Sequence, residues 1–108
     1  MDEHKIHQSI EQRVKRAARA VEPEAEVILF GSRSRGDATP ESDWDFLILV
    51  EGLSDERRED ALRHEIYEIE WDTGEVLSTL VVDRESWDSP RYRAMPLHQA
   101  VVRDGVVL

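Results

Sequence analysis

The sequence has no cysteine, only two lysines and no long apolar run. The absence of cysteine excludes disulfides and metal sites built from thiolates. A membrane-spanning helix needs roughly 18 or more consecutive apolar residues, and no segment approaches that length. The beginning of the chain, residues 1–5, is charged rather than apolar. We therefore expect a cytoplasmic protein that makes no membrane contact.

Carboxylates dominate the charge of the chain, which has 24 acidic residues, 14 lysines and arginines, and a formal net charge of -10. This acidity argues against long nucleic acid as a partner, because binding it requires basic side chains to neutralise phosphates. Arginine supplies almost all of the positive charge. An acidic, lysine-poor composition resembles that of proteins from high-salt cytoplasm, and adaptation to salt is one hypothesis for it.

The most informative feature is the segment GSRSRGDATPESDWD, residues 31–45, in which a Gly-Ser pair is followed after ten residues by Asp-x-Asp. It lies between two short apolar runs, residues 27–30 and 46–50. Both runs are rich in β-branched or aromatic residues, which predicts buried strands. The segment therefore connects the ends of two core strands.

The Gly-Ser pair has the chemistry of a phosphate-binding turn. Gly31 permits a tight turn and a close approach of the backbone to a ligand. A helical turn beginning at Ser32 would direct unpaired N–H groups and a positive dipole end at an anion. Arg33 and Arg35 add positive charge near by, and Gly36 allows the chain to turn again. We predict that Gly31, Ser32, Arg33 and Gly36 bind the phosphates of a nucleotide.

The Asp-x-Asp pair has the chemistry of a metal site. Asp43 and Asp45 open the second apolar run, and side chains two apart on a strand share one face, while Trp44 points the other way. Two converging carboxylates repel each other unless a cation neutralises them, and such hard oxygen ligands suit Mg²⁺. An isolated Asp-x-Asp is more often a solvated loop end. The Gly-Ser turn at this interval favours a metal-nucleotide site instead.

A Gly-Ser pair, a ten-residue gap and Asp-x-Asp resemble the signature of the DNA polymerase beta-like nucleotidyltransferase superfamily, and the chain is most similar to its minimal nucleotidyltransferases. The matching residues are Gly31, Ser32, Gly36, Ser42, Asp43 and Asp45. The resemblance covers nearly the whole chain. It implies an α/β (α+β) fold, with a small mixed β-sheet flanked by helices. A length of 108 residues suits one domain, so we expect residues 1–108 to form a single nucleotidyltransferase domain.

The resemblance also implies an activity, the Mg²⁺-dependent transfer of a nucleoside monophosphate, AMP from ATP, to a hydroxyl group. It implies two Mg²⁺ ions on the catalytic residues Asp43 and Asp45, with the phosphates held by Ser32 and its neighbouring amides. Minimal nucleotidyltransferases often stand beside HEPN-domain proteins, so the implied partner is a HEPN-type toxin and this chain its antitoxin. Larger relatives carry an added acceptor domain, and we expect this chain to take its acceptor surface from a partner.

The third carboxylate that the superfamily supplies from a later strand is missing where we expect it. The predicted strand spans residues 76–82, and Ser78 occupies the position aligned with the acid. Serine is a weak metal ligand and a poor base. Four neighbouring acids are candidates for a shifted substitute: Glu70, Asp72, Glu75 and Asp83. The third acid helps to hold the ion that activates the attacking hydroxyl, so we predict that nucleotide binding survives and that transfer is slow or absent.

Two other functions therefore stay open. The first is a catalytically degenerate nucleotide-binding module that neutralises its partner by complex formation alone. The second is transfer to a small-molecule alcohol such as an aminoglycoside, which the absence of an acceptor domain disfavours.

Hydrophobic periodicity predicts helices before and after the motif. The first is amphipathic and covers residues 6–21, and the second runs from a cap at Ser54 to a stop at Gly74. The apolar stripe predicted for the second helix contains Ala61, Leu62, Ile66 and Ile69. We expect Tyr67 and Trp71 to cover the sheet edge, since aromatic residues at helical spacing usually pack.

The C-terminal region predicts a turn at residues 83–87 and an irregular stretch at residues 91–95 between two prolines. In that stretch Tyr92 either packs inward or reaches a nucleotide base or a partner. A short helix follows at residues 97–103. The apolar tail, residues 106–108, is expected to dock on its own sheet as an edge strand or on another chain, which would form an oligomer.

Overall fold

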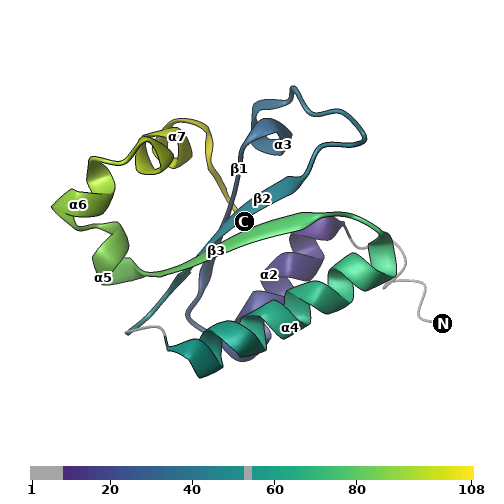
Figure 1. The fold of residues 1–108 in the computed structure, drawn as a ribbon, viewed down its shortest axis with the longest axis horizontal. Coiled ribbons are helices and arrows are strands. Elements are labelled where there is room, and N and C mark those ends of the chain that lie inside the picture. Colours follow the sequence, from purple (N-terminus) through teal and green to yellow (C-terminus); the bar gives the residue numbers. More distant parts are fainter. Residues whose placement is uncertain (1–8, 53–54) are drawn as a thin grey trace.

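The computed structural model describes residues 9–52 and 55–108, and within them four strands form one mixed sheet (Figure 1). The strands are β1 (Glu26–Phe30), β2 (Trp44–Val50), β3 (Leu77–Asp83) and β4 (Val106–Val107), in the order β3-β2-β1-β4. β1 is antiparallel to β2 and β4, whereas β2 and β3 are parallel. The predicted mixed sheet is therefore confirmed, and the C-terminal tail docks on its own sheet.

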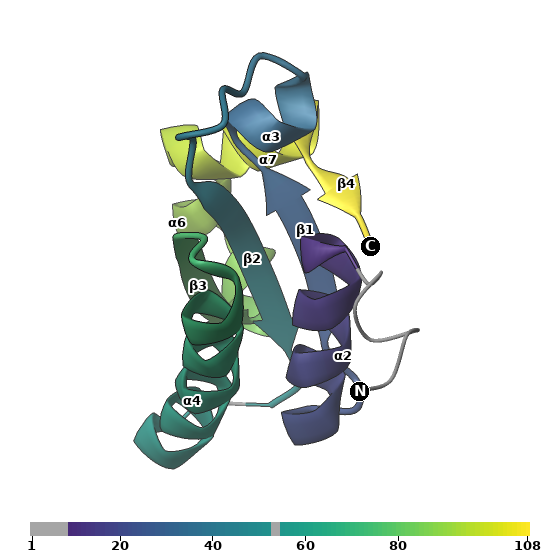
Figure 2. The ribbon, with the colours of Figure 1, turned by 90° about the vertical axis from the view of Figure 1, so that its right-hand side faces the viewer.

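Helices cover both faces of this sheet. On one face lie α2 (Ile10–Val21) and α4 (Glu56–Thr73), side by side in Figure 2. On the other face lie α5 (Arg84–Trp87), α6 (Pro90–Arg93) and α7 (Pro96–Asp104). The short helix α3 (Ser32–Arg35) follows directly after β1. The sheet is thus the middle layer of three.

Strand β2 is buried on both faces, which explains its unbroken apolar sequence. Phe46 belongs to the core under α2 and α4, and Leu47 belongs to the core under α5, α6 and α7. Because successive side chains alternate between faces, Asp45 shares the face of Leu47. Trp44 shares the face of Phe46 and packs against the same core.

The long helix α4 has clear end signals. The side chain of Asp55 accepts the backbone N–H of Arg58 at 2.8 Å, which caps the N-terminus. Gly74 ends the helix in the left-handed region with φ of 75°, which confirms the predicted stop. The predicted cap at Ser54 and the predicted helical residues 6–8 lie outside the described residues.

Three expectations about packing and local structure are wrong. Tyr67 and Trp71 do not cover the sheet edge, because their side chains are 62% and 79% exposed, and Ala61 is exposed as well. Residues 83–87 contain the helix α5 rather than a turn alone, and residues 91–95 are largely helix α6. Tyr92 packs inward against the core under α5, α6 and α7.

None of the helices in residues 9–52 and 55–108 has the length and apolar character needed to cross a bilayer.

Candidate nucleotide site

The Gly-Ser turn folds as predicted. Gly31 has a φ of 78° and precedes the four-residue helix α3, whose start is held by Ser34 and Arg35. The backbone N–H groups of Ser34 and Arg35 each donate to the Gly31 carbonyl at 3.1 Å, and the Ser34 hydroxyl donates to it at 2.9 Å. Gly36 ends the turn with φ of 84°. The N–H groups of a first helical turn have no intrahelical acceptor, so the N–H of Ser32 has no acceptor within α3.

Asp45 packs directly against this turn. Phe30 and Asp45 are partners across the β1–β2 pair, so the carboxylate lies beside the residue that follows β1. A Cβ at position 31 would overlap Oδ2 of Asp45 and lie 3.2 Å from its Cγ. Glycine is therefore required twice at position 31, once for its positive φ and once for the space that the carboxylate occupies.

Asp43 and Asp45 form the acidic pair that the sequence predicts. Partial burial and the neighbouring Asp43 carboxylate raise the pKa of Asp45 above its ordinary value, and the charge of Arg35 offsets part of that rise. This mutual repulsion is what a bound cation relieves, and two carboxylates suit one Mg²⁺ that takes its other oxygens from phosphates and water. Among the described residues, no group of three or more acids, histidines or cysteines is placed to hold a metal ion.

Ser78, which the resemblance aligns with the third acid, stands beside Asp45. In the parallel pair of β2 and β3, Asp45 is the partner of Ser78 and Leu47 is the partner of Leu80. Paired residues of neighbouring strands share a face, so the exposed Ser78 side chain and the Asp45 side chain lie on the same side of the sheet.

Each of the four acids proposed as substitutes for a carboxylate at Ser78 already has a partner, and none of them is the register partner of Asp45. The partners are the N–H of Leu77 for Glu70 (2.9 Å), Arg13 for Asp72 (2.8 Å), the indole N–H of Trp44 for Glu75 (3.3 Å) and the N–H of Ser86 for Asp83 (2.9 Å).

Arg33 lies on the opposite side of the loop from the Asp45 carboxylate. Its guanidinium stacks over the Trp44 ring, 4.4 Å from the centroid, and its Nη2 donates to the Ser42 carbonyl at 2.9 Å. Glu75 lies 3.9 Å from the same nitrogen. Among the described side chains, the Nε of Arg33 is buried without a hydrogen-bond partner. Arg33 thus fastens α3 to the start of β2, and a contact with nucleotide stays a prediction.

The charge of Arg35 acts on the carboxylate of Asp45. The residues predicted from the sequence to bind nucleotide include Arg33 but not Arg35. The Nε of Arg35 donates to Asp37 at 3.2 Å. Its charge also acts on Asp104, whose pKa is lowered first by the hydrogen bond from Arg103 and then by the charges of Arg103 and Arg35. No local pattern predicts this effect on Asp104, because β4 must pair with β1 before the end of α7 comes within range of the Arg35 charge.

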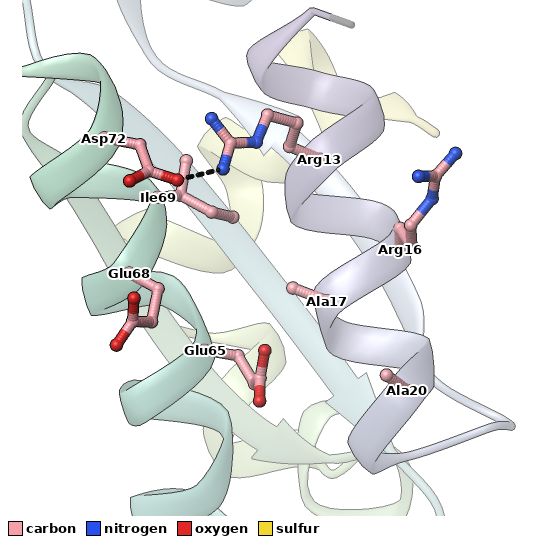
Figure 3. Close-up of a pocket in the computed structure, with 8 residues that line it drawn as sticks. All are labelled: Arg13, Arg16, Ala17, Ala20, Glu65, Glu68, Ile69 and Asp72. Carbon is pink, nitrogen blue, oxygen red and sulfur yellow. Dashed lines mark hydrogen bonds and ion pairs between the residues drawn. The ribbon is translucent and has the colours of Figure 1, made fainter. Parts of the chain in front are cut away.

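A groove of about 350 Å³ lies elsewhere, between α2 and α4 (Figure 3). Arg13 and Asp72 close one part of it with an ion pair of 2.8 Å. The residues that line it are Arg13, Arg16, Ala17, Ala20, Glu65, Glu68, Ile69 and Asp72. None of the predicted site residues is among them, so the groove is separate from the turn and the acidic pair.

A glycine-led turn packed against one of two paired carboxylates, at one end of a mixed sheet, defines an α/β domain suited to phosphate and a divalent cation. The chain belongs to the nucleotidyltransferase domain family, whose model matches residues 8–95. This match confirms the predicted resemblance and, with the sheet topology, the predicted fold class. No curated protein matches the sequence.

Two solved structures share the fold. One is a toxin–antitoxin complex with AMP-PNP, with 24% sequence identity and a TM-score of 0.62 over 92% of this chain and 72% of that chain. The other is a variant of the toxin–antitoxin complex MntA-HpeT, with 26% identity and a TM-score of 0.62 over 94% of this chain and 72% of that chain.

Proposed function

We propose that this chain is the antitoxin of a HEPN-type toxin and transfers AMP from ATP, with Mg²⁺, to a hydroxyl on that partner in the cytoplasm. The observation that carries the proposal is the packing of Asp45, paired with Asp43, against Gly31. The family match supports nucleotidyl transfer. The similar fold of two toxin–antitoxin complexes, one of them with AMP-PNP, supports both the partner class and an adenine nucleotide.

Each part of the site has a role in this reaction. The turn at Gly31 and Ser32 holds the β- and γ-phosphates with its N–H groups, so that the α-phosphorus lies over the acidic pair. Asp43 and Asp45 would hold Mg²⁺, which when bound neutralises charge on the phosphates. The acceptor oxygen then attacks the α-phosphorus, the bond to the β-phosphate breaks, and pyrophosphate leaves in line.

The residues present fit one Mg²⁺ better than the two that the family resemblance implies. Two carboxylates and the phosphates of ATP complete the shell of a nucleotide-bound ion. A second ion, next to the attacking hydroxyl, would have Ser78 in place of a carboxylate. We therefore propose that ATP binding is strong and that transfer is slow.

The position of Ser78 also supports a second candidate, a degenerate module that binds nucleotide and neutralises the toxin by covering it. The neighbouring acids bind other partners, and the residue paired with Asp45 on β3 is Ser78 rather than any of them. The presence of both Asp43 and Asp45 supports the enzyme, whereas a serine in place of the third carboxylate at position 78 supports the binding module.

Transfer of labelled AMP distinguishes the two candidates. The purified chain is incubated with ATP labelled at the α-phosphate, MgCl₂ and a HEPN-type toxin as the acceptor. We expect slow labelling of the partner by the native chain and none by Asp43→Ala. Full neutralisation of toxin activity without any label would support the covering module. Labelling that is unchanged in Asp43→Ala would contradict the proposed site.

A further inference from the structure

We propose that Ser78 is itself an acceptor, so that the chain adenylylates its own β3 strand. This inference rests on the proposed nucleotidyl transfer and names one acceptor for it. Ser78 is exposed and is the register partner of Asp45. Neighbouring strands are about 4.8 Å apart, so its hydroxyl lies one strand away from the carboxylate that would hold the metal.

The hydroxyl of Ser78 points onto the face where ATP would lie. Leu77 belongs to the core under α2 and α4, and Val82 belongs to the opposite core. By alternation, Ser78 and Leu80 share the face of Val82, and Thr79 shares the face of Leu77. Of the hydroxyls on β3, only that of Ser78 therefore faces the acidic pair.

Among the described residues, the hydroxyls of Ser34 and Ser42 near the turn are already bonded, whereas those of Ser32 and Ser78 are not. Ser32 belongs to the turn that we propose to hold the phosphates, which leaves Ser78 as the candidate acceptor. The Ser34 hydroxyl donates to the Gly31 carbonyl, and the Ser42 hydroxyl accepts the N–H of Thr39 at 2.9 Å. Within residues 9–52 and 55–108, the Ser78 hydroxyl makes no hydrogen bond. Attack requires a nucleophile about 3–3.5 Å from the reacting atom, and the Ser78 hydroxyl breaks no hydrogen bond to another described residue when it moves toward that atom.

The reaction is balanced by ATP alone. The Ser78 Oγ attacks the α-phosphorus, a new Oγ–P bond forms, and the bond between the α-phosphorus and the bridging oxygen of the β-phosphate breaks. Pyrophosphate leaves with the electron pair, and the hydroxyl proton passes to water. The product is a phosphodiester that places AMP over Asp45, so each chain reacts once and then has its nucleotide site blocked.

Mass spectrometry of the whole chain after incubation with ATP and MgCl₂ tests this inference. We expect one added adenylyl group, which peptide fragmentation assigns to Ser78. The group should be lost in Ser78→Ala and retained in Ser78→Thr, which keeps a hydroxyl at the same place. Thr79→Ala, which removes the neighbouring hydroxyl on the other face, is the matched control and should be modified like the native chain.

Two further measurements make the result decisive. The fraction modified at a fixed time should be unchanged by tenfold dilution, because the reaction is intramolecular. ATP binding with and without Mg²⁺ is measured on Ser78→Ala, which keeps the turn and the acidic pair but lacks the hydroxyl that the modification would use. Metal-dependent binding without an adenylyl group, or with the group on another residue, overturns the role of Ser78 and leaves the nucleotide site standing. The absence of metal-dependent binding overturns the proposed function and this inference together.

Discussion

Gly31 and Asp45 are packed so closely that any side chain at position 31 would overlap the carboxylate. The contact joins the two halves of the site, because Gly31 begins the turn after β1 and Asp45 lies at the start of β2. An anion held by the turn and a cation held by the carboxylate would therefore be neighbours. This arrangement is the physical basis for assigning both to one metal-bound nucleotide.

Replacing Gly31 by alanine should damage the site more than replacing Gly36. Both glycines have a positive φ, so either alanine strains the backbone by about 1–2 kcal/mol. A Cβ at Gly36 meets no atom within 4 Å, whereas one at Gly31 overlaps Asp45. Urea unfolding and ATP titration should show a smaller loss of stability and of ATP affinity for Gly36→Ala than for Gly31→Ala. Equal ATP affinities would contradict the importance of the contact.

Arg33→Lys should loosen the loop between α3 and β2. Lysine cannot keep the stack on Trp44 and the hydrogen bond to the Ser42 carbonyl together, because it lacks the planar fork of arginine. We expect a loss of about 1–2 kcal/mol in the free energy of unfolding. Arg63→Lys, at an exposed arginine 3.8 Å from Asp60, is the control and should change stability little. Equal effects would show that the stack contributes nothing.

Ser78→Asp should restore a third carboxylate next to Asp45. With Mg²⁺ and ATP we expect transfer to the partner protein to rise at least about tenfold, equivalent to ~1.4 kcal/mol in the barrier. Without Mg²⁺ the variant should be less stable than the native chain, because a third negative charge joins the pair. Ser78→Asn has the same size without the charge and also lacks the hydroxyl, so it measures any gain that comes only from the loss of self-modification. A rise in Ser78→Asn equal to that in Ser78→Asp would exclude the metal explanation.

Asp83 should contribute stability that depends on pH. The Ser86 hydroxyl and backbone N–H lower the pKa of Asp83, which caps α5. A carboxylate whose pKa is lower in the folded state than in the unfolded state stabilises the protein at any pH above the unfolded-state pKa. That stabilisation is lost as the pH falls through the folded-state pKa. Asp83→Ala should lower the urea midpoint at pH 7, and the difference should shrink below about pH 4. A difference that is constant with pH would contradict this origin.

The local backbone features of the candidate site could be predicted from the sequence because their signals are local. Two apolar runs bound the motif, and a positive-φ glycine and Asp-x-Asp each have one structural use there. The resemblance placed Ser78 where the superfamily has its third acid, whereas the parallel register that pairs Ser78 with Asp45 came only from the structure. The distances between these residues follow from the sheet geometry alone.

Other features depend on interactions that no short window contains. Helix α4 was assigned correctly, but its buried side is set by Leu62, Ile66 and Ile69, which turns Tyr67 and Trp71 toward solvent. The four-residue helices α5 and α6 have too few residues for a periodic pattern and depend on side-chain caps. The effect of Arg35 on Asp104 requires the pairing of β4 with β1, which joins distant parts of the chain.

The most direct test of the metal-nucleotide site is calorimetric titration of ATP with and without Mg²⁺ into the native chain, Asp45→Asn and Glu41→Gln. Glu41 is an exposed acid of the same loop, so its variant makes the same change in charge outside the pair. We predict at least about tenfold tighter binding with Mg²⁺, or ~1.4 kcal/mol, for the native chain and Glu41→Gln, and no metal dependence for Asp45→Asn. ATP affinity that is indifferent to Mg²⁺ in the native chain, or equally dependent on it in Asp45→Asn, would contradict the assignment.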